Sequence, residues 1–519
     1  MIKRKMAGTE DVFKKIISHA KEYGFVFPSS EIYDGLSAVY DYGQNGTELK
    51  NNIKDYWWTS MVRMNENIVG LDAAILMHPT TWKASGHVDA FSDPLIDNKD
   101  SKKRYRADNL IEDYLDKIRV KIDKEIAKAA KRFGDQFDEE TYRTTNERVM
   151  GYQEKIDTVN GKMVEAISKN DMAGMREIIV DAGIACPESG SKNWTDVRQF
   201  NLMFSTEMGS VSTESSTIYL RPETAQGIFV NFLNVQKTGR MKIPFGIAQI
   251  GKAFRNEIVA RQFIFRLKEF EQMEMQYFVK PGEQMKWYDE WKERRLAWYT
   301  GLGLPAEKLR FHAHENLAHY ADAAEDIEFE FPMGFREVEG IHSRTDFDLK
   351  AHEDASGKKL QYFDNEANES YTPYVVETSM GLDRMVLAVL SHAFTEEELE
   401  GGSSRVVMKI PAPLAPVKAA FFPLVKKDGL PEVAREIIDE LKLDFNCLYE
   451  EKDTIGKRYR RQDAIGTPFC VTVDHDTLED NAVTIRERDS MEQKRVPIAD
   501  LGAIIGEAVD IKSLFNNRS

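Results

Sequence analysis

The sequence predicts an α+β protein, in which an antiparallel sheet flanked by helices carries a helical insertion and is followed by a C-terminal α/β domain. Two apolar and aromatic runs between residues 243 and 279 flank a short polar segment, which is the pattern of an antiparallel hairpin. From about 89 to 198 the chain is charged, and its apolar residues recur at helical spacing. After residue 411, strand-like and helix-like segments alternate, which indicates a domain with a mixed sheet.

The composition fits a globular protein of several domains. The 519 residues suffice for about three domains, and 42% of them are hydrophobic and 30% charged. No apolar run approaches the ~18 residues that span a membrane, and the N-terminus has no apolar signal core, so we expect neither membrane association nor secretion. Three scattered cysteines form no disulfide framework, which favours a cytoplasmic location. The net charge of −16 argues against bulk nonspecific binding of nucleic acid, but local basic patches can still contact phosphates.

Two helices are predicted near the N-terminus. The first begins near Thr9 and ends at Gly24. The second runs from Thr47, a residue type that caps helices well, to about Met64. Base rates alone favour an ordinary buried helix with aromatic packing for this second segment.

The second strand of the hairpin has two chemically different faces. Because side chains alternate along a strand, we expect one face, which carries apolar side chains, to lie in the core. These apolar residues are Leu267, Met273 and Met275. The other face carries Arg266, Phe270, Gln272 and Glu274. Convergent polar groups of this kind are more typical of a binding site than of a purely structural hairpin.

The insertion contains a strongly periodic helix at residues 110–133. Its apolar positions are Ile111, Leu115, Ile118, Ile122 and Ile126. We expect the chain to stay helical to about Ile179, with a break near Gly161. The basic run from Arg104 to Arg106 is by itself typical of a solvated face, and no motif for chemistry is found in the helical part.

Two segments bear on metal binding. A structural zinc site needs four nitrogen or sulfur ligands, and the segment Cys186–Gly190 offers one cysteine, so we predict no zinc there. His312, His314 and His319 lie close in sequence. Without a cysteine or carboxylate to complete the set, such histidines are more often packed or hydrogen-bonded than bound to a metal.

The chain after the hairpin predicts further strands and two helices. A Trp- and Lys-rich helix is expected on the surface at 281–300, a strand at Ile327–Phe331, and a strand ending at Glu377 that leads into a helix from Leu382. The sequence contains neither Gly-x-x-x-x-Gly-Lys-Ser/Thr nor Gly-x-Ser-x-Gly, so a nucleotide has to be held by arginines rather than by a glycine loop.

Several segments together resemble the class II aminoacyl-tRNA synthetases. Residues 254–257, Phe-Arg-Asn-Glu, and 266–274, Arg-x-x-x-Phe-x-x-x-Glu, resemble motif 2. Residues 24–58 resemble motif 1, and 374–384 resemble motif 3. Residues 221–227, Arg-Pro-Glu-Thr-Ala-Gln-Gly, are similar to the glycyl-tRNA synthetases of the single-chain, dimeric type.

The resemblance implies a domain organisation and a reaction. It implies a class II catalytic domain at 1–88 and 199–410, the mostly helical insertion at 89–198, and an anticodon-binding domain at 411–519. It implies a homodimer joined through 24–64. The implied activity is that of a glycine–tRNA ligase, which uses ATP with Mg²⁺ to make glycyl-adenylate and transfers glycine to tRNA(Gly).

The formation of an adenylate from ATP explains why arginines are expected in the site. Negative charge grows on the phosphate oxygens as pyrophosphate leaves, and a fixed guanidinium lowers that barrier. The resemblance makes Arg255 and Arg384 catalytic, places Phe270 against adenine and gives Glu337 the magnesium ion. The implied ATP-binding residues are Arg255, Asn256, Glu257, Phe265, Arg266, Phe270, Glu337, Val338, Gly381 and Arg384.

The implied glycine site is rich in carboxylates. Glu223, Glu274 and Glu377 converge on the substrate ammonium, which they bind by charge pairing. The full implied set is Arg106, Glu223, Phe270, Glu271, Glu274, Arg344, Glu377, Ser379 and Gly381. Burial statistics leave open that any one of the glutamates is a solvated strand residue.

The C-terminal domain follows a proline-rich joint at 411–416 and contains a basic turn at Lys457–Arg461 with Tyr459 interleaved. Arginine and aromatic groups suit unstacked RNA bases, and the resemblance assigns Arg458, Arg460 and Arg461 to tRNA; a solvated basic turn is the alternative.

Two other functions stay open. One is an ATP-dependent ligase that adenylates a small acid without tRNA, against which the C-terminal domain argues. The other is a noncatalytic tRNA-binding paralogue, which Arg255, Phe270, Glu274 and Arg384 disfavour.

Overall fold

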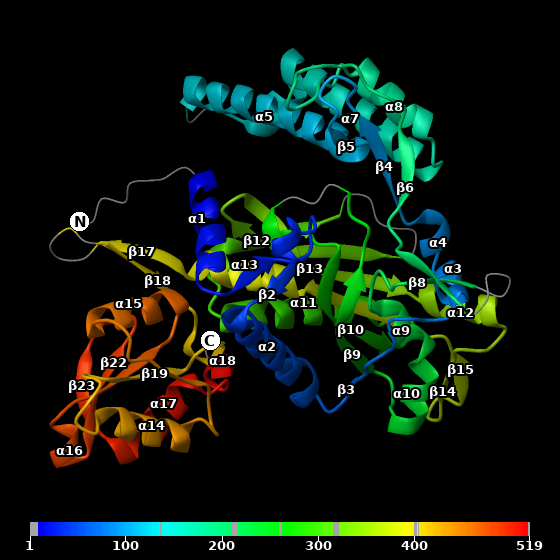
Figure 1. Ribbon diagram of the computed structural model, residues 1–519. Coiled ribbons are helices and arrows are strands. Elements are labelled where there is room, and N and C mark those ends of the chain that lie inside the picture. The colour runs from blue at the N-terminus through cyan, green and yellow to red at the C-terminus, as the bar shows by residue number, and fades with distance from the viewer. Residues whose placement is uncertain are drawn as a thin grey trace. The chain divides into compact units, whose positions relative to one another are not determined.

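The computed structural model describes residues 9–134, 137–209, 216–258, 262–314, 321–398, 402 and 404–516 (Figure 1). His319 lies outside these residues. The chain forms two compact units, of which the first comprises Met1–Ser85, Phe204–Arg255 and Ala260–Ser519, and the second comprises Gly86–Met203 with Asn256–Val259.

A seven-stranded sheet is the centre of the first unit. The strand order is β11-β12-β13-β16-β10-β9-β3, and all neighbours are antiparallel except β3 and β9. The bounds are β3 Ile68–Gly70, β9 Phe245–Phe254, β10 Glu269–Val279, β11 Leu309–Ala313, β12 Ala323–Phe331, β13 Gly334–Thr345 and β16 Tyr374–Gly381. Strands β9 and β10 are the predicted hairpin, with Phe270 opposite Ala253. The predicted antiparallel sheet is therefore confirmed.

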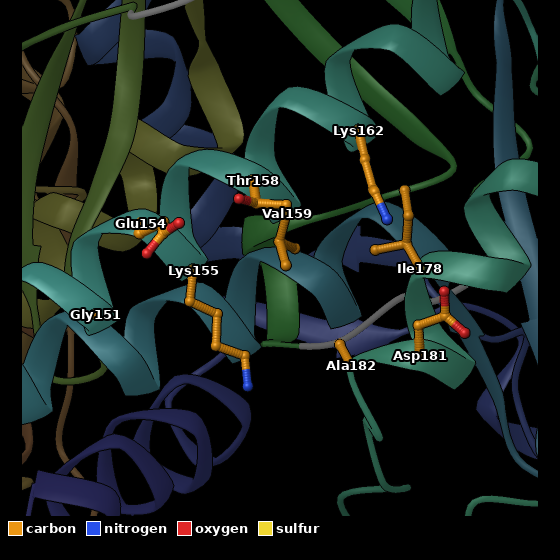
Figure 2. A pocket seen from close by; sticks show the side chains of 9 residues that line it. All are labelled: Gly151, Glu154, Lys155, Thr158, Val159, Lys162, Ile178, Asp181 and Ala182. Carbon is orange, nitrogen blue, oxygen red and sulfur yellow. The ribbon is translucent and has the colours of Figure 1, made fainter.

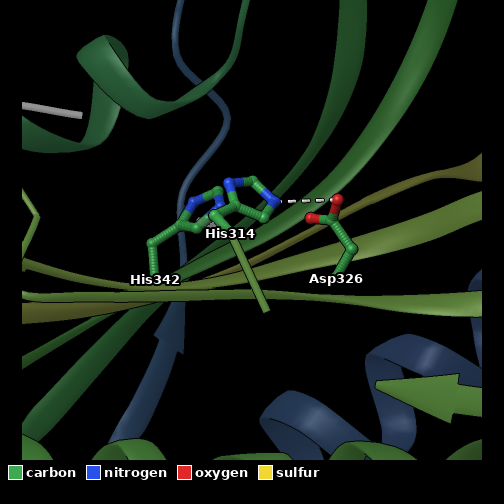
Figure 3. Close-up of side chains that lie close together, drawn as sticks. All are labelled: His314, Asp326 and His342. Carbon is green, nitrogen blue, oxygen red and sulfur yellow. Dashed lines mark ion pairs between the residues drawn. The ribbon is translucent and has the colours of Figure 1, made fainter. Parts of the chain in front are cut away.

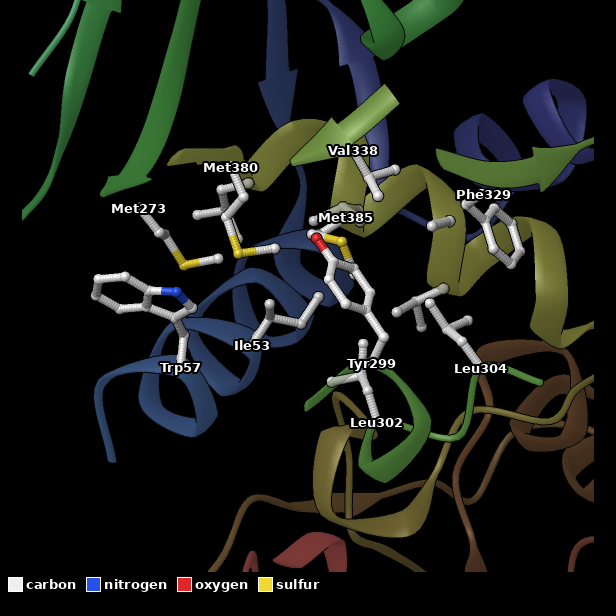
Figure 4. Packing of buried hydrophobic residues seen from close by; sticks show 14 of the residues in the cluster. Ile53, Trp57, Met273, Tyr299, Leu302, Leu304, Phe329, Val338, Met380 and Met385 are labelled. Atoms are coloured by element: carbon white, nitrogen blue, oxygen red, sulfur yellow. The ribbon is translucent and has the colours of Figure 1, made fainter. Parts of the chain in front are cut away.

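The helices α2 (Gln44–Trp58), α11 (Gln284–Gly301) and α13 (Leu382–Ala393) pack against one face of this sheet. Figure 4 shows part of the core, in which Met273 of β10 and Met380 of β16 lie near Trp57 of α2 and Tyr299 of α11. Met273 is buried as its alternation predicted. The prediction of a surface helix at 281–300 was wrong, because Trp298 and Tyr299 are at most 1% exposed. Full burial of such a side chain contributes on the order of 2 kcal/mol. Charged residues such as Asp289, Glu293 and Arg294 stay exposed on the other side of the helix.

Helix α2 begins earlier than predicted. Gly43 is its N-cap, so Thr47 lies inside the helix, and a π-helical turn, η2 (Thr59–Arg63), continues it. The reason is a close approach: a Cβ atom on Gly46 would lie 1.9 Å from the carbonyl oxygen of Phe25. Only glycine lets the first turn of the helix pack this tightly against the preceding strand.

The second unit combines a three-stranded sheet with a group of four helices, in addition to the short helix α4 (His87–Ala90) before the sheet. The strands β4 (Ser92–Asp97), β5 (Arg104–Arg106) and β6 (Arg198–Asn201) lie in the order β5-β4-β6. The helices are α5 (Ala107–Phe133), α6 (Glu139–Thr145), α7 (Glu147–Ser168) and α8 (Met172–Asp181). All five apolar positions predicted for α5 are buried. The predicted break near Gly161 was wrong, because α7 runs through this residue and an exposed glycine costs a helix only about 1 kcal/mol.

The C-terminal segment forms the predicted mixed sheet. Its order is β20-β19-β21-β22-β23, with β19 (Ala419–Pro423) parallel to β20 (Cys447–Tyr449) and β21 (Phe469–Val473). Strands β22 (Ala482–Glu487) and β23 (Gln493–Pro497) are antiparallel, and α14 (Leu430–Leu441), α15 (Ile455–Ile465) and α17 (Leu501–Val509) complete this part. The predicted basic turn was wrong, since Lys457–Arg461 lies within α15.

Shorter elements connect these parts. They are α1 (Thr9–Glu22), β1 (Val26–Pro28), β2 (Tyr40–Tyr42), α3 (Pro79–Ala84), α4 (His87–Ala90), β7 (Ser205–Met208), β8 (Ser216–Tyr219), α9 (Ala225–Val230), α10 (Phe232–Gly239), α12 (Phe347–Ser356), β14 (Tyr362–Asp364), β15 (Glu369–Tyr371), β17 (Phe394–Glu398), β18 (Ser404–Met408), α16 (Thr477–Asp480) and α18 (Ser513–Asn516). Among the described residues, none of the helices has the length and apolar character needed to cross a membrane.

Two helical glycines test the packing argument. Gly46→Ala should destabilise the protein by roughly 1–3 kcal/mol, because the new methyl group collides with the Phe25 carbonyl. The matched control is Gly161→Ala, where no atom lies within 4 Å of the new methyl group, and where helix propensity predicts a gain of up to about 1 kcal/mol. Melting temperatures measure both effects, and an equal response of the two variants would contradict the close approach at Gly46.

Candidate active site

Polar side chains form a row across the face of the sheet opposite the core. Gln276 of β10 lies opposite Glu377 of β16, and Glu377 lies opposite His342 of β13. Glu274 precedes Gln276 by two residues and therefore shares its face. The register of three neighbouring strands thus places two carboxylates, an amide and an imidazole side by side.

Gln276 joins the two glutamates of this row. Its Nε2 amide donates to Oε1 of Glu274 at 2.7 Å and to Oε2 of Glu377 at 2.6 Å. The Thr224 hydroxyl donates to Oε2 of Glu274, and Nδ1 of His342 lies 2.8 Å from Oε1 of Glu377. Glu274 is 1% exposed and Glu377 is 4% exposed, so protein hydrogen bonds rather than bulk water position both carboxylates.

The neighbouring charges act differently on the two glutamates. Burial raises the pKa of Glu377, but the Arg344 guanidinium and the hydrogen bond and charge of His342 outweigh it and lower the pKa to about 2. Nη1 of Arg344 lies 3.2 Å from Oε2 of Glu377. Burial and the charges of Glu377 and Glu223 raise the pKa of Glu274 well above its usual value. The site therefore gains stability from a cation bound beside Glu274.

Glu223 lies in the loop between β8 and α9. Nε2 of Gln226 donates to Oε1 of Glu223 at 3.0 Å and to Oδ1 of Asp348 at 3.1 Å. Asp348 accepts two hydrogen bonds from Arg344, at 2.8 and 3.0 Å, and His352 binds the amide oxygen of Gln226. The structure thus brings together four residues of the predicted glycine site: Glu223, Glu274, Arg344 and Glu377.

Two arginines flank a second acidic residue beyond this row. Nη1 of Arg384 lies 3.0 Å from Oε2 of Glu337. The Arg384 guanidinium also lies over the ring of Phe265, 4.5 Å from the ring centroid. The guanidinium of Arg255 lies 5.3 Å over the ring of Phe270. The charge of Arg384 lowers the pKa of Glu337, and the charge of Arg255 lowers it further. Arg255 and Arg384, two of the three predicted ATP-binding arginines, therefore both act on Glu337, and each lies over an aromatic ring.

The remaining predicted residues of the first unit contribute in different ways. Nε2 of Gln272 donates to the Ser379 hydroxyl at 3.3 Å, and Gly381 is the N-cap of α13. Val338 is fully buried in the core, so its side chain does not face the site (Figure 4). Arg266 lies beside the segment before β2, at a cavity of about 510 Å³.

Glu271 does not join the predicted glycine site. Alternation along β10 places it on the face opposite Phe270 and Glu274, where Lys50 lies 3.1 Å and Lys54 2.6 Å from its carboxylate. We therefore exclude Glu271 from the proposed substrate contacts. The resemblance alone assigned Glu271 to this site, whereas the strand period of two separates it from Phe270 and Glu274.

Asp383 connects β10, α2 and α13 through a buried charge network. Its Oδ2 accepts from the backbone N–H of Glu271 at 2.8 Å. Its Oδ1 accepts from the Tyr42 hydroxyl at 2.5 Å and from Nζ of Lys50 at 3.1 Å. Burial opposes the charge of Lys50, but Asp383 and Glu271 together raise its pKa. Because Arg384 follows Asp383, this network fixes the start of the helix that carries Arg384.

Three predicted residues belong to the second unit. Arg106 pairs there with Asp93 at 2.9 Å and with Asp108 at 2.6 Å. Asn256 donates its backbone N–H to the carbonyl of Leu202 at 2.8 Å, and the charge of Glu257 raises the pKa of Arg106 further. The predicted roles of Arg106, Asn256 and Glu257 stay predictions.

The basic helix α15 offers fewer surface charges than its sequence indicates. Arg458 is 3% exposed, and its guanidinium donates to backbone carbonyls that include Pro423, at 2.6 Å, and Asp453. Arg461 pairs with Glu450 and Asp453. Arg460 is exposed. We exclude Arg458 from the proposed tRNA contacts, because its buried guanidinium donates hydrogen bonds to backbone carbonyls of the same domain. The predictions for Arg460 and Arg461 stay predictions.

The second unit presents one further cavity and a cysteine. A cavity of about 320 Å³ lies between α7 and α8. Its lining includes Lys155, Lys162 and Asp181, whose side chains Figure 2 shows. Sγ of Cys186 lies 3.2 Å from the Tyr105 hydroxyl and 3.5 Å from the Ser101 hydroxyl. These neighbours are oxygen donors rather than the sulfur and nitrogen ligands of a structural zinc site.

Sequence reasoning missed several residues of the carboxylate cluster: Gln226, Gln276, His342 and Asp348. Gln276 could have been found, because it follows Glu274 at the strand period of two. Asp348 follows Arg344 by four residues, a helical spacing that hides their contact when the segment is taken as a strand. His342 depends on the register of β13 against β16, which no local signal indicates.

Three family models match the chain. The tRNA synthetase class II core domain (G, H, P, S and T) matches residues 204–393, and the anticodon binding domain matches 418–508. The glycyl-tRNA synthetase insertion domain 1 matches residues 93–202. The sheet, its row of polar side chains and these matches define a class II tRNA synthetase.

Curated relatives identify the family within this class. The glycine–tRNA ligase of Chlorobaculum tepidum is 52% identical over 483 residues, which cover 93% of this chain and 97% of the relative. The enzyme of Macrococcus caseolyticus is 50% identical, and the alignment covers 96% of this chain and 99% of the relative. The enzyme of Geobacillus thermodenitrificans is 49% identical, and the alignment covers 96% of this chain and 97% of the relative. The chain belongs to the glycine–tRNA ligase family, and the resemblance seen in the sequence is confirmed.

The network around Asp383 makes a testable prediction. Asp383→Asn should destabilise the protein by about 3–5 kcal/mol, because Lys50 then keeps a buried charge with only one carboxylate beside it. Urea unfolding followed by tryptophan fluorescence measures this change.

The control for that variant is Glu396→Gln, which removes an exposed pair with Lys15 whose side chains are 45% and 49% exposed. Such surface pairs contribute at most about 1 kcal/mol. If Asp383→Asn unfolds at the same urea concentration as Glu396→Gln, the network does not stabilise the junction of α2, β10 and α13.

Proposed function

We propose that the protein is a glycine–tRNA ligase that activates glycine with ATP to glycyl-adenylate and pyrophosphate, and then transfers glycine to the 3′ end of tRNA(Gly) with release of AMP. The observation that carries this proposal is a carboxylate cluster in which Glu274 and Glu377 stand on one sheet face and Glu223 joins them from the loop before α9. Arg255 and Arg384 both act on Glu337, which also interacts with His342 of the same row. The cluster suits an ammonium group, and the arginines suit a polyphosphate.

In the proposed glycine site, the three carboxylates bind the substrate ammonium. Glu274 and Glu377 are held by Gln276, and Glu377 is also held by Arg344. Ser379, Gly381 and Phe270 are proposed to line the same site, and Arg106 to close it. A site crowded in this way leaves little room at the α-carbon, which favours glycine over every larger amino acid.

In the proposed ATP site, Arg255 and Arg384 stabilise the charge that develops on the phosphates, and Phe270 stacks on adenine. Phe265, Arg266 and the backbone of Val338 are proposed to complete the site, with Asn256 and Glu257. Glu337 suits a magnesium ion, because Mg²⁺ prefers a few carboxylates plus phosphate oxygens and this carboxylate is 47% exposed. The ion shields the phosphates when it is bound.

The proposed mechanism needs no covalent enzyme intermediate. The glycine carboxylate is already ionised and attacks the α-phosphorus directly. The chain therefore contributes positioning and charge stabilisation rather than proton transfer. The fixed carboxylates orient the ammonium end, and the arginines orient the triphosphate, so that the reacting atoms meet.

The C-terminal part supports a tRNA partner. It matches the anticodon binding domain, and its helix α15 presents Lys457 and Arg460 at the surface. We propose that Arg460 and Arg461 contact the tRNA, where arginine planes stack on unpaired bases. The three free cysteines, Cys186, Cys447 and Cys470, support a reducing cytoplasm as the place of action.

Two assays test the function. Glycine-dependent exchange of labelled pyrophosphate into ATP reports activation, and charging of tRNA(Gly) reports transfer. Exchange without charging would favour the ligase that adenylates a small acid without tRNA, and loss of both would favour the noncatalytic paralogue. Exchange with serine or alanine as fast as with glycine would overturn the assignment of the amino acid.

Arg255→Ala tests the proposed catalytic charge. The variant should lose pyrophosphate exchange by about 10²–10³-fold with the fold intact, because the growing negative charge loses its partner. Arg336→Ala is the matched control, since Arg336 is an exposed arginine of the same sheet. Exchange near the wild-type rate in folded Arg255→Ala would remove Arg255 from the mechanism.

The raised pKa of Glu274 predicts a pH dependence. In the free protein Glu274 is protonated below its raised pKa, whereas a bound ammonium favours the carboxylate, so glycine binding releases a proton. The KM for glycine should therefore fall as the pH rises, below the range in which the amino group of glycine itself deprotonates. Exchange assays across pH measure this slope.

Glu274→Gln separates this effect from others. Glutamine cannot ionise, so the variant should have a higher KM for glycine that no longer falls with pH, while the KM for ATP keeps its wild-type pH profile. A wild-type slope that persists in Glu274→Gln would assign the proton to another group.

We further propose that the chain forms a homodimer through residues 24–64. The turn after β1 exposes three large apolar side chains: Ile32 at 87%, Tyr33 at 79% and Leu36 at 59%. Contiguous exposed apolar side chains on a globular protein mark an interaction surface.

Charged substitutions test the dimer. The double variant Ile32→Asp with Leu36→Asp should shift the protein toward its 59.5 kDa monomer, because two buried carboxylates in an interface cost several kcal/mol. Leu443→Asp is the control, since Leu443 is 85% exposed in the C-terminal part. Light scattering measures the mass, and a wild-type monomer at micromolar concentration would contradict the proposal.

A further inference from the structure

Two histidines and an aspartate converge beside the carboxylate row. His314 follows β11, Asp326 lies on β12 and His342 on β13 (Figure 3). Their ligand atoms all lie within 4.8 Å of one another. Among the described residues, no other group of three His, Cys, Asp or Glu side chains lies this close together. Two neutral imidazoles with one carboxylate are a ligand set that proteins use for metal ions.

The strand register explains why these side chains meet. His342 lies opposite Ala324 on β12, and the backbone N–H of His314 donates to the Ala324 carbonyl at 3.1 Å. Asp326 follows Ala324 by two residues and therefore points to the same face. All three side chains thus stand on the face that carries Glu377; Asp326 and His342 lie on strands, and His314 is tied to β12 by its backbone hydrogen bond.

Gly340 leaves the space between the ligands open. A Cβ atom at this position would lie 3.2 Å from Nε2 of His342 and 3.6 Å from Oδ1 of Asp326. Both of these atoms therefore border one small space that a side chain would fill. On its other side Asp326 accepts from Nε2 of His314, with 2.9 Å between nitrogen and oxygen.

The second nitrogen of His342 is already oriented for metal binding. Nδ1 lies 2.8 Å from Oε1 of Glu377. In the neutral imidazole, which is the form that binds a metal ion, this carboxylate accepts the Nδ1 proton and the lone pair is on Nε2. For Nε2 itself, no hydrogen-bond partner is found among the residues that the structure describes. A carboxylate that holds the far nitrogen of a histidine ligand is a recurring feature of metal sites.

We propose that His314, Asp326 and His342 form a site for a borderline transition-metal ion such as Zn²⁺ or Co²⁺. The ligands are Nε2 of each histidine and the Asp326 carboxylate, with water in the remaining position. On binding, the hydrogen bond from His314 to Asp326 is replaced, because the proton of His314 moves from Nε2 to Nδ1. Two imidazole nitrogens select such ions against Mg²⁺, which prefers oxygen ligands only.

This site goes beyond the proposed ligase activity, and its three ligands differ from Glu337, the proposed magnesium ligand, whose charge acts on Asp326. The sequence offered only neighbouring histidines without a carboxylate, whereas the fold supplies Asp326 and His342 from two other strands. A bound ion fixes the tautomer of His342, and hence the hydrogen bond that holds Glu377.

Direct metal titration tests the proposal. Full-length protein without a histidine tag is stripped with a chelator and titrated with Co²⁺, whose visible absorption reports coordination, and Zn²⁺ is then added as a competitor. We expect one Co²⁺ per chain, displaced by Zn²⁺ but not by a large excess of Mg²⁺. The readout does not use catalysis, so its failure is distinct from failure of the proposed function.

Variants locate the ion. His314→Ala and Asp326→Asn should each weaken Co²⁺ binding tenfold or more; His314 is 35% exposed, so its removal leaves the core intact. His475→Ala is the matched control, because it removes another histidine–aspartate pair, with Asp428 at 3.1 Å, and should leave binding unchanged. No saturable binding, equal affinity in His314→Ala, or displacement of Co²⁺ by Mg²⁺ would each overturn the site.

Discussion

The central constraint on this protein is the burial of two carboxylates side by side, Glu274 and Glu377, on one face of a sheet. Buried charges are costly unless they are paired and hydrogen-bonded. The fold meets this cost by polar contacts from three different segments: the Gln276 amide between the two carboxylates, the Arg344 guanidinium on Glu377, and the Thr224 hydroxyl on Glu274. These contacts exist only if β10, β16 and β13 keep their register, since a slip of one residue turns every side chain to the other face.

That register depends on the opposite face of the sheet. Met273 and Met380 pack there with Trp57 and Tyr299 (Figure 4). A slip of one residue would turn both methionines out of this core. The Asp383 network adds a polar connection at the edge of this core, because it ties β10 to α2 and to the first turn of α13. Contacts of Asp383 on the core side of the sheet therefore fix the backbone of Arg384, while the Arg384 guanidinium pairs with Glu337.

Sequence reasoning was most reliable where one local period decides the outcome. The strand period gave the two faces of β10, and the helical period gave the buried positions of α5. It failed where a distant segment decides. The start of α2 depends on the Phe25 carbonyl packing against Gly46, and the burial of Arg458 depends on carbonyls at the ends of other segments, such as Pro423. A basic run in the sequence gives the number of charges but not their direction.

The same limit applies to the site itself. Glu223, Glu274, Arg344 and Glu377 follow from motifs that lie far apart in the chain, and resemblance alone could collect them. Glu271 was included for the same reason, although the period of two excludes it. His342 could not be found, because its partner Glu377 is set by strand pairing. The residues that hold the carboxylates in place are thus harder to predict than the carboxylates, since they are selected by geometry rather than by reaction chemistry.

The rigidity of the cluster bears on selectivity in the proposed reaction. A pocket that merely lacks contacts for an extra methylene discriminates by only about 1–3 kcal/mol. Exclusion by collision is stronger, but it requires walls that do not move. Glu377 is held by His342, Arg344 and Gln276 at once, so a larger substrate can displace it only by breaking several buried, charge-assisted hydrogen bonds together. The network that makes two buried carboxylates tolerable therefore also fixes the walls of the proposed glycine site. Rigid walls exclude larger amino acids by collision and admit the smallest one.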